Sequence, residues 1–328
     1  MSEASPYSRL ASPRETRAVL ERFDLAAKHR LGQNFLVCDA VIGRILELAE
    51  LDPEDVVLEV GPGIGTLTVA LLPRVAAVCA IEADRTLAPV LSETCATDGE
   101  KLALVVADAL KVGPAEVAAA LAACGGQADK VVPTKLVSNL PYQVAATVIM
   151  RFLQEWPSLG RCVVMVQAEV ADRICAEPGS RTYGAYTAKL ALLGRVTGRF
   201  EVGPSSFTPA PHVDSAVVRI ERTRPRDPQT GEPLAPAQVA ATTAVIDAAF
   251  AQRRKTIRNS MSASGFAKDE LDRGLAAAGI DSRRRAETLA PAEFVRLAAA
   301  LPSALPAAPS AIPPAVPPAA LPLGGNHA

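Results

Sequence analysis

Histidine, aromatic residues and paired cysteines are scarce in this chain. Of 328 residues, three are histidine and six are cysteine, and aromatic residues make up 4%. No two cysteines form a C-x-x-C pair, so the common zinc patterns are excluded. We therefore expect reduced thiols and no bound metal.

The chain also lacks an excess of positive charge and an N-terminal signal sequence. Its formal net charge is −1, so any nucleic-acid binding must come from local clusters of cations. The N-terminus does not show the basic-then-apolar order of a signal peptide. These features favour a cytoplasmic protein.

Charged residues are absent from residues 301–328, but this segment is not predicted to span a membrane. It contains eight prolines, which prevent a continuous helix. We predict a disordered Pro/Ala-rich tail.

The middle of the chain alternates short apolar runs with glycine turns and helical segments. Runs that are apolar on both faces predict a parallel sheet covered by helices on each side, and 195–202 with 215–220 predict an antiparallel pair that closes it. The fold class is thus α/β, with a seven-stranded, mostly parallel sheet and a small all-helical C-terminal domain. The expected divisions are a flexible N-terminal extension (1–27), the α/β domain (28–221), a proline-rich linker (222–236), the helical domain (237–300) and the tail (301–328).

A glycine turn follows the first of these strands. Gly61, Gly63 and Gly65 give the spacing G-x-G-x-G, which lets a ligand approach the backbone closely. Glu82 lies 21 residues after Gly61 and ends the next strand, where its carboxylate can bind ribose hydroxyls. Asp108 ends the third strand and can accept from an adenine amino group. Together these positions are typical of S-adenosylmethionine binding in class I, Rossmann-like methyltransferases.

The segment Ser138-Asn139-Leu140-Pro141-Tyr142 ends the fourth strand and resembles the (Asp/Asn)-x-Pro-Tyr signature of amino methyltransferases. The exocyclic nitrogen of adenine is a poor nucleophile because its lone pair is delocalised into the ring. The Asn139 amide oxygen and the Leu140 carbonyl can accept its hydrogens and favour a pyramidal nitrogen. Pro141 stiffens the loop, and Tyr142 can stack on the base.

With these motifs, further blocks make the sequence similar to a known family, the KsgA/RsmA small-subunit ribosomal RNA adenine dimethyltransferases. The blocks are 28–36, 59–68, 139–142, 207–209, 213–218 and 252–259. The resemblance implies additional cofactor contacts at Asn34, Leu36 and Asn139. It also implies that Phe207 contacts the other face of the target base. It also implies dimethylation of two adjacent adenosines in a hairpin loop near the 3′ end of small-subunit (16S) rRNA, late in 30S assembly. We expect the enzyme to be a monomer.

Clusters of cations are the expected RNA contacts, because focused positive charge suits phosphate groups. A charged run can equally be a solvated helix face, and part of the block 252–259 is expected to pack on the main domain. The candidates are Lys28, Arg30, Arg253, Arg254, Lys255, Arg258, Arg283 and Arg284.

Three alternatives remain open at this stage. Erythromycin-resistance methyltransferases modify adenine in large-subunit rRNA with a similar core, although the blocks at 213–218 and 252–259 argue against them. A protein-glutamine methyltransferase would use a similar Asn-Pro-Tyr element. The chain could also be mainly a binding factor in ribosome assembly.

Overall fold

The computed structural model describes residues 7–25, 33–124 and 132–301. Its strands are β1 (Phe35–Leu36), β2 (Val56–Val60), β3 (Ala77–Glu82), β4 (Leu102–Val106), β5 (Lys135–Asn139), β6 (Arg161–Gln167), β7 (Gly194–Val202), β8 (Phe207–Thr208) and β9 (Ser215–Arg222). Its α-helices are α1 (Pro13–Arg22), α2 (Asp39–Ala49), α3 (Thr66–Leu71), α4 (Ala88–Thr94), α5 (Pro114–Ala123), α6 (Ala145–Glu155), α7 (Ala168–Ile174), α8 (Ala185–Leu190), α9 (Pro236–Phe250), α10 (Ile257–Ala263), α11 (Lys268–Ala277) and α12 (Pro291–Ala300). Within these ranges, no helix combines the length and the apolar character needed to cross a membrane.

Seven strands form one sheet in the order β4-β3-β2-β5-β6-β9-β7. Neighbouring strands from β4 to β6 are parallel, whereas β9 runs antiparallel to both β6 and β7. The predicted mostly parallel sheet with an antiparallel closing pair is therefore confirmed. β1 and β8 form a separate antiparallel pair.

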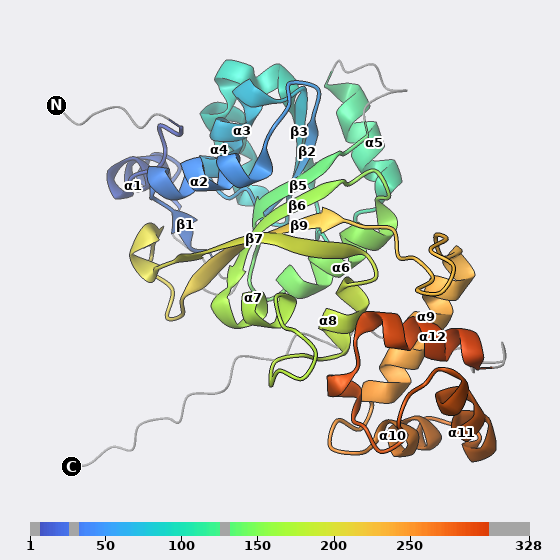
Figure 1. Cartoon of the computed structure of the whole chain (residues 1–328). Helices are drawn as coiled ribbons and strands as arrows, with labels where there is room; N and C mark the ends of the chain where they lie inside the picture. The colour runs from blue at the N-terminus through green and yellow to red at the C-terminus, as the bar shows by residue number, and fades with distance from the viewer. Residues whose placement is uncertain (1–6, 26–32, 125–131, 302–328) are drawn as a thin grey trace, which may run out of the picture.

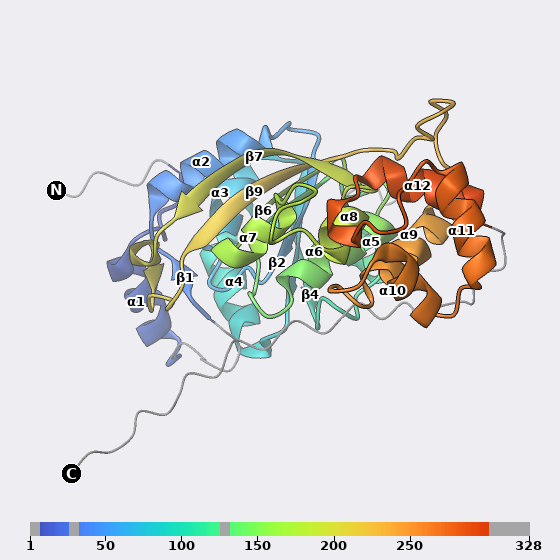
Figure 2. The ribbon, with the colours of Figure 1, turned by 60° about the horizontal axis from the view of Figure 1, so that its bottom comes forward.

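Helices cover both faces of the sheet (Figures 1 and 2). Helices α2, α3 and α4 bury apolar side chains against one face, and α5, α6 and α7 bury theirs against the other. Along β2, Leu58 joins the cluster under α6 and Val57 joins the cluster under α2. Because both faces are buried, these strands carry apolar residues at successive positions.

The N-terminal segment differs from the sequence prediction. The sequence predicts a flexible extension over residues 1–27, but residues 7–25 contain α1 and pack onto the α/β domain. Ser12 caps this helix through its Oγ, which accepts from Glu15 N at 3.1 Å. Leu10 and Val19 are buried in one cluster with Ile64. Burial of such side chains stabilises the docked segment by roughly 1.5–3 kcal/mol each. The sequence pattern of a helix of only ten residues does not reveal that the helix is docked.

Helices α9 to α12 form the predicted small helical region. They follow residues 223–235, where an isolated bridge joins Arg226 to Pro233. The buried side chains of this region share a cluster with Tyr183, Ala188 and Leu192, which lie in and beside α8. Figure 1 shows α8 next to α9 and α12. The helical region therefore completes its core with part of the α/β domain.

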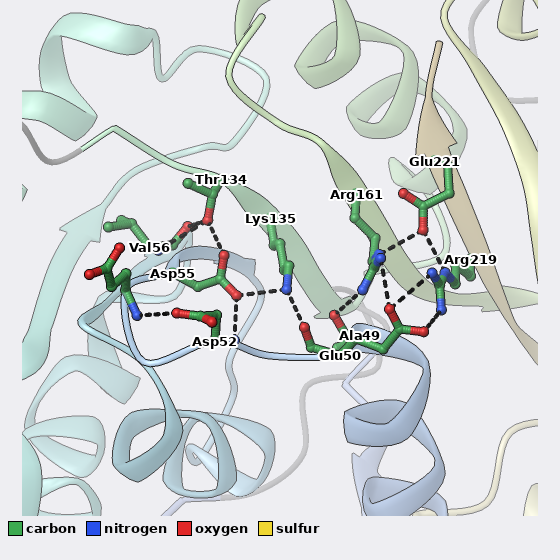
Figure 3. A network of polar contacts seen from close by, with 11 residues as sticks. Ala49, Glu50, Asp52, Asp55, Val56, Thr134, Lys135, Arg161, Arg219 and Glu221 are labelled. Atoms are coloured by element: carbon green, nitrogen blue, oxygen red, sulfur yellow. Dashed lines mark hydrogen bonds and ion pairs between the residues drawn. The ribbon is translucent and has the colours of Figure 1, made fainter.

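The amino edge of the sheet, where β2, β5 and β6 begin, is closed by ion pairs (Figure 3). Lys135 Nζ lies 2.6 Å from Asp55 Oδ2, and both side chains are largely buried. Arg161 contacts Glu50 at 3.0 Å and Glu221 at 2.7 Å. These pairs join α2 to the start of β5 and β6.

Candidate functional site

A pocket opens at the opposite, carboxyl edge of the sheet. It lies where the strand order reverses, because β2 has β3 on one side and β5 on the other. In open α/β sheets, ligands bind at such switch points. The polar and glycine residues that line the pocket are Gln33, Asn34, Glu59, Gly61, Gly63, Thr66, Glu82, Asp108, Asn139, Tyr142 and Gln143.

Ser138 holds the two central strands together at the mouth of this pocket. The backbone pairing of β2 with β5 covers only Val57 and Leu58 on the β2 side. Beyond them, Ser138 Oγ donates to Val60 O at 2.6 Å and accepts from Val60 N at 3.2 Å. Ser138 belongs to the predicted motif, but its role is not evident from the sequence. The available signal was a hydroxyl residue that directly follows the apolar positions of this strand.

The three glycines of the turn divide into two roles. Gly61 and Gly63 line the pocket with φ of +69° and +62°. A Cβ on Gly61 would lie 2.9 Å from Cγ of Pro141, so this glycine lets the two loops meet. Gly65 does not line the pocket; a Cβ there would lie 3.0 Å from Thr94 Oγ1, beneath α4. The structure thus gives Gly65 a packing role, and its predicted cofactor contact stays a prediction.

The two predicted acids at strand ends reach the same pocket. Glu82 is buried, and its carboxylate accepts from Gly63 N at 3.2 Å and from Asp84 N at 2.8 Å. Burial raises its pKa above the ordinary value despite these hydrogen bonds. Asp108 is exposed, and its Oδ1 accepts from Leu110 N at 2.9 Å. Both carboxylates retain acceptor sites that a ligand can use.

Glu59 is a buried acid for which the sequence predicts no role. Its Oε2 accepts from Thr68 Oγ1 at 2.7 Å, which ties β2 to α3 across the glycine turn. Burial raises its pKa to about 8, with a smaller contribution from the neighbouring charge of Glu82. A carboxyl group that is largely neutral near pH 7 is tolerated there without a cationic partner.

The loop Asn139–Tyr142 forms one wall of the pocket. Leu140 N donates to Met165 O at 3.1 Å, which fixes the loop to β6. Within the described part of the chain, the side-chain amide of Asn139 has no hydrogen-bond partner, although the residue is only half-exposed. An amide oxygen held on a strand end and left without a protein donor is suited to bind a ligand amine.

Of the further residues that the family resemblance implies, two line the pocket and one does not. Asn34 and Leu36 line the pocket, as expected. Phe207 does not line it: this residue is 3% exposed in β8, opposite Leu36 of β1, and belongs to the core under α2. The structure therefore places Phe207 among core side chains, and its contact with the target base stays a prediction.

Three of the predicted RNA-binding cations are paired with carboxylates of the protein. Arg258 forms a two-pronged pair with Asp272 at 2.5 and 2.6 Å, and Arg284 contacts Glu293 at 2.6 Å. Arg253 lies 3.2 Å from a carboxylate oxygen of Glu287. It also donates to the carbonyls of residues 181 and 183, so it joins the α9–α10 loop to the α7–α8 loop.

Other cations remain available to a ligand. Arg254 and Lys255 are exposed, and neither side chain has a hydrogen bond or ion pair to any described residue. Arg283 pairs with Asp281 at 3.0 Å, but its side chain is 87% exposed, so the pair is weak. Lys28 and Arg30 lie outside the described residues. In the part of the chain that is described, no group of three or more His, Cys, Asp or Glu side chains is arranged to hold a metal.

Comparison with known proteins gives one consistent family. The family model for ribosomal RNA adenine dimethylase matches residues 25–302. The "Ribosomal RNA small subunit methyltransferase A" of Nocardia farcinica is 43% identical over 91% of this chain and 99% of its own length. The protein of the same name from Corynebacterium glutamicum is 40% identical over 90% and 96%.

Solved structures agree on the fold. The 23S rRNA methyltransferase ErmE has a TM-score of 0.61 and 26% identity, covering 82% of this chain and 99% of that chain. A dimethyladenosine transferase from Plasmodium falciparum has a TM-score of 0.62 at 22% identity, covering 80% and 95%. The second likeness shows the α/β methyltransferase fold alone.

Proposed function

This chain belongs to the ribosomal RNA adenine dimethylase family, and we propose that it transfers methyl groups from S-adenosylmethionine to two adjacent adenosines of small-subunit (16S) rRNA. The target is a hairpin loop near the 3′ end, each adenosine becomes N6,N6-dimethyladenosine, and the reaction takes place late in 30S assembly in the cytoplasm.

One observation carries the proposal. The loop Asn139–Tyr142 and the acids Glu82 and Asp108 line the same pocket, although 57 residues of sequence separate Glu82 from Asn139. An amine acceptor held by the loop would therefore face a donor held by the acids. Proximity and orientation of this kind convert a slow bimolecular transfer into an effectively unimolecular one.

The residues of the pocket fit S-adenosylmethionine. The buried carboxylate of Glu82 would accept from the ribose hydroxyls, and Asp108 from the adenine amino group, because both carboxylates keep unused acceptor sites. Asn34 and Leu36, together with the backbone at Gly61 and Gly63, would line the rest of the cofactor. When bound, the cofactor supplies an electrophilic methyl group on its sulfonium centre.

The loop Asn139–Tyr142, here called the acceptor loop, aligns the target amine with the methyl donor. The Asn139 amide oxygen and the Leu140 carbonyl accept hydrogens of the adenine N6 amine, which favours a lone pair directed at the donor. Tyr142 stacks on the base, worth roughly 1–3 kcal/mol. No general base has to act first, since the proton becomes acidic once the nitrogen is alkylated. Preorganised acceptors of this kind act without reorganisation in the transition state.

The rRNA would approach the pocket along the exposed cations. Arg254 and Lys255 are the strongest of the predicted phosphate contacts, since no described residue neutralises them. We propose that the protein acts as a monomer on an immature 30S particle.

The proposal is tested with the purified chain, S-adenosylmethionine and two separate substrates, unmethylated 30S particles and unmethylated 23S rRNA. Mass spectrometry of nuclease fragments is expected to show two adjacent dimethyladenosines in the 16S fragment alone. Methylation of 23S rRNA alone would favour the erythromycin-resistance activity, which the likeness to ErmE keeps as the alternative. Tight binding to 30S without any methylation would overturn the enzymatic assignment.

A further inference from the structure

A side-chain hydrogen bond joins the acceptor loop to a distant strand. Tyr142 OH lies 2.6 Å from Ser215 Oγ, across 73 residues of sequence. Ser215 is the first residue of β9 and is fully buried. Among the described residues, Tyr142 is the one side-chain hydrogen-bond partner of the Ser215 hydroxyl.

The other contacts of the loop are made by its backbone and by Pro141, and they include a hydrogen bond from Val144 N to Pro141 O at 3.1 Å. Leu140 N donates to Met165 O, and Pro141 packs over the space that a Cβ on Gly61 would fill. None of these contacts restrains the torsion angles of the Tyr142 side chain. The hydroxyl contact at its far end restrains the χ1 torsion, because it holds the oxygen, and with it the direction in which the ring points.

The surroundings keep this contact intact over a wide pH range. Burial raises the pKa of Tyr142 above its ordinary value, so the phenol keeps its proton at neutral pH. The serine is also rigidly placed: it pairs with Gln167 of β6 and Val202 of β7, and the next carbonyl back, that of Asp214, accepts from Ala168 N at 2.9 Å.

We propose that Ser215 is a positioning residue for methyl transfer, which holds the hydroxyl end of Tyr142 so that the ring points to the place where the target adenine stacks. The inference rests on the proposed function and adds to it a residue outside the pocket lining. It also gives a physical reason for the block Val213–Val218: the strand that begins in this block places the Ser215 hydroxyl behind the loop Asn139–Tyr142.

The experiment compares Ser215→Ala, Tyr142→Phe and the double variant with unmethylated 30S particles at saturating S-adenosylmethionine. Each single variant is expected to lower kcat about three- to tenfold, the effect of one neutral hydrogen bond. The double variant is expected to be no slower than the worse single variant, because both changes remove the same contact. The Kd for S-adenosylmethionine is expected to stay unchanged.

Ser260→Ala is the matched control. Ser260 is also fully buried, and its Oγ donates to Ala248 O at 2.9 Å in the helical region. This variant is expected to unfold at a lower temperature with an unchanged kcat. A Ser215→Ala variant that behaved in the same way would show a structural role and overturn the inference, as would single effects that multiply in the double variant. If Ser215→Ala does not fold, Tyr142→Phe decides: a wild-type kcat overturns the inference.

Tyr142→Ala separates this inference from the proposed function. Loss of the ring is expected to lower kcat/KM for the particle by about 10- to 100-fold, as stacking is removed. If Tyr142→Ala is impaired while Tyr142→Phe and Ser215→Ala are normal, the base contact stands and the positioning role falls. If Tyr142→Ala is fully active, the base contact itself is wrong.

Discussion

At the amino edge of the sheet, the cations Lys135 and Arg161 are bound to carboxylates, whereas at the carboxyl edge the side-chain amide of Asn139 has no hydrogen-bond partner among the described residues. Figure 3 shows how closely the groups of the amino edge are paired. Both edges belong to the same strands, because β5 begins at Lys135 and ends at Asn139. Paired charges stabilise a fold, and unpaired acceptors are available to a ligand. The structure therefore separates stability from binding along the length of a single strand.

The two edges also differ in how acids respond to burial. Burial alone would raise the pKa of Asp55, but hydrogen bonds from Lys135, Asp52 N and Thr134 hold it below the ordinary value. Its contribution to stability is thus present above its ordinary pKa and is lost as the pH falls through the lower folded value. At the carboxyl edge the pKa of Glu82 is raised, since no cation offsets its burial.

The largest effect is expected at the carboxyl edge. Asn139→Ala removes an acceptor for the target amine, and we expect kcat on unmethylated 30S particles to fall by about 100-fold or more, as for loss of one preorganised polar group. The midpoint of thermal unfolding should not change. Gln229→Ala, which removes an exposed carboxamide from the linker, is the control and should be fully active. Comparable activity of the two variants would show that the carboxyl edge is not the site of methyl transfer.

The next effect is expected at the amino edge. Lys135→Ala leaves Asp55 largely buried without its cation, and we expect a loss of about 2 kcal/mol, between the values for exposed and buried pairs. Thermal unfolding should begin about 4–8 °C lower, with kcat unchanged at 25 °C. Lys111→Ala, on an exposed lysine, should have almost no effect. A lower kcat in Lys135→Ala at full folding would mean that the two edges are coupled.

A smaller effect is expected for the cofactor. Glu82→Gln removes the charge that binds the ribose, so the Kd for S-adenosylmethionine measured by calorimetry should rise by roughly tenfold. Because burial raises the pKa of Glu82, wild-type affinity should be constant at alkaline pH and fall as the pH drops through a value above 4.5. The variant should lack this fall. Glu169→Gln, at an exposed carboxylate, is the control; a variant that keeps the fall would exclude Glu82 as its source.

The smallest effect is expected from the helical region, where paired and unpaired cations occur side by side. Replacing both Arg254 and Lys255 by Ala should reduce the salt dependence of RNA affinity by a slope of about 1.4–1.8, corresponding to two phosphate contacts. Arg258→Ala should leave the slope unchanged, because Arg258 already pairs with Asp272. Filter binding at several salt concentrations measures both slopes. Equal slopes for the two variants would show that intramolecular pairing does not predict RNA contact.

Much of the site could be predicted from local sequence. The turn at Gly61 and the acids Glu82 and Asp108 are recognisable because each follows an apolar strand, and parallel strands bring their carboxyl ends to one edge. The roles expected for Gly65 and Phe207 stay predictions: in the structure the first packs beneath α4 and the second lies in the core. The sequence does not reveal this packing, since a motif does not show what surrounds a residue in space.

The sequence by itself determined the order of strands and helices, the glycine turn and the acceptor loop, because these depend on the periodicity and conformational limits of neighbouring residues. Only the tertiary structure decided that α1 is docked, that Arg258 is paired while Arg254 is not, and that Ser215 contacts Tyr142. Those contacts join residues far apart in the chain, and they form only where packing brings two side chains within hydrogen-bond distance.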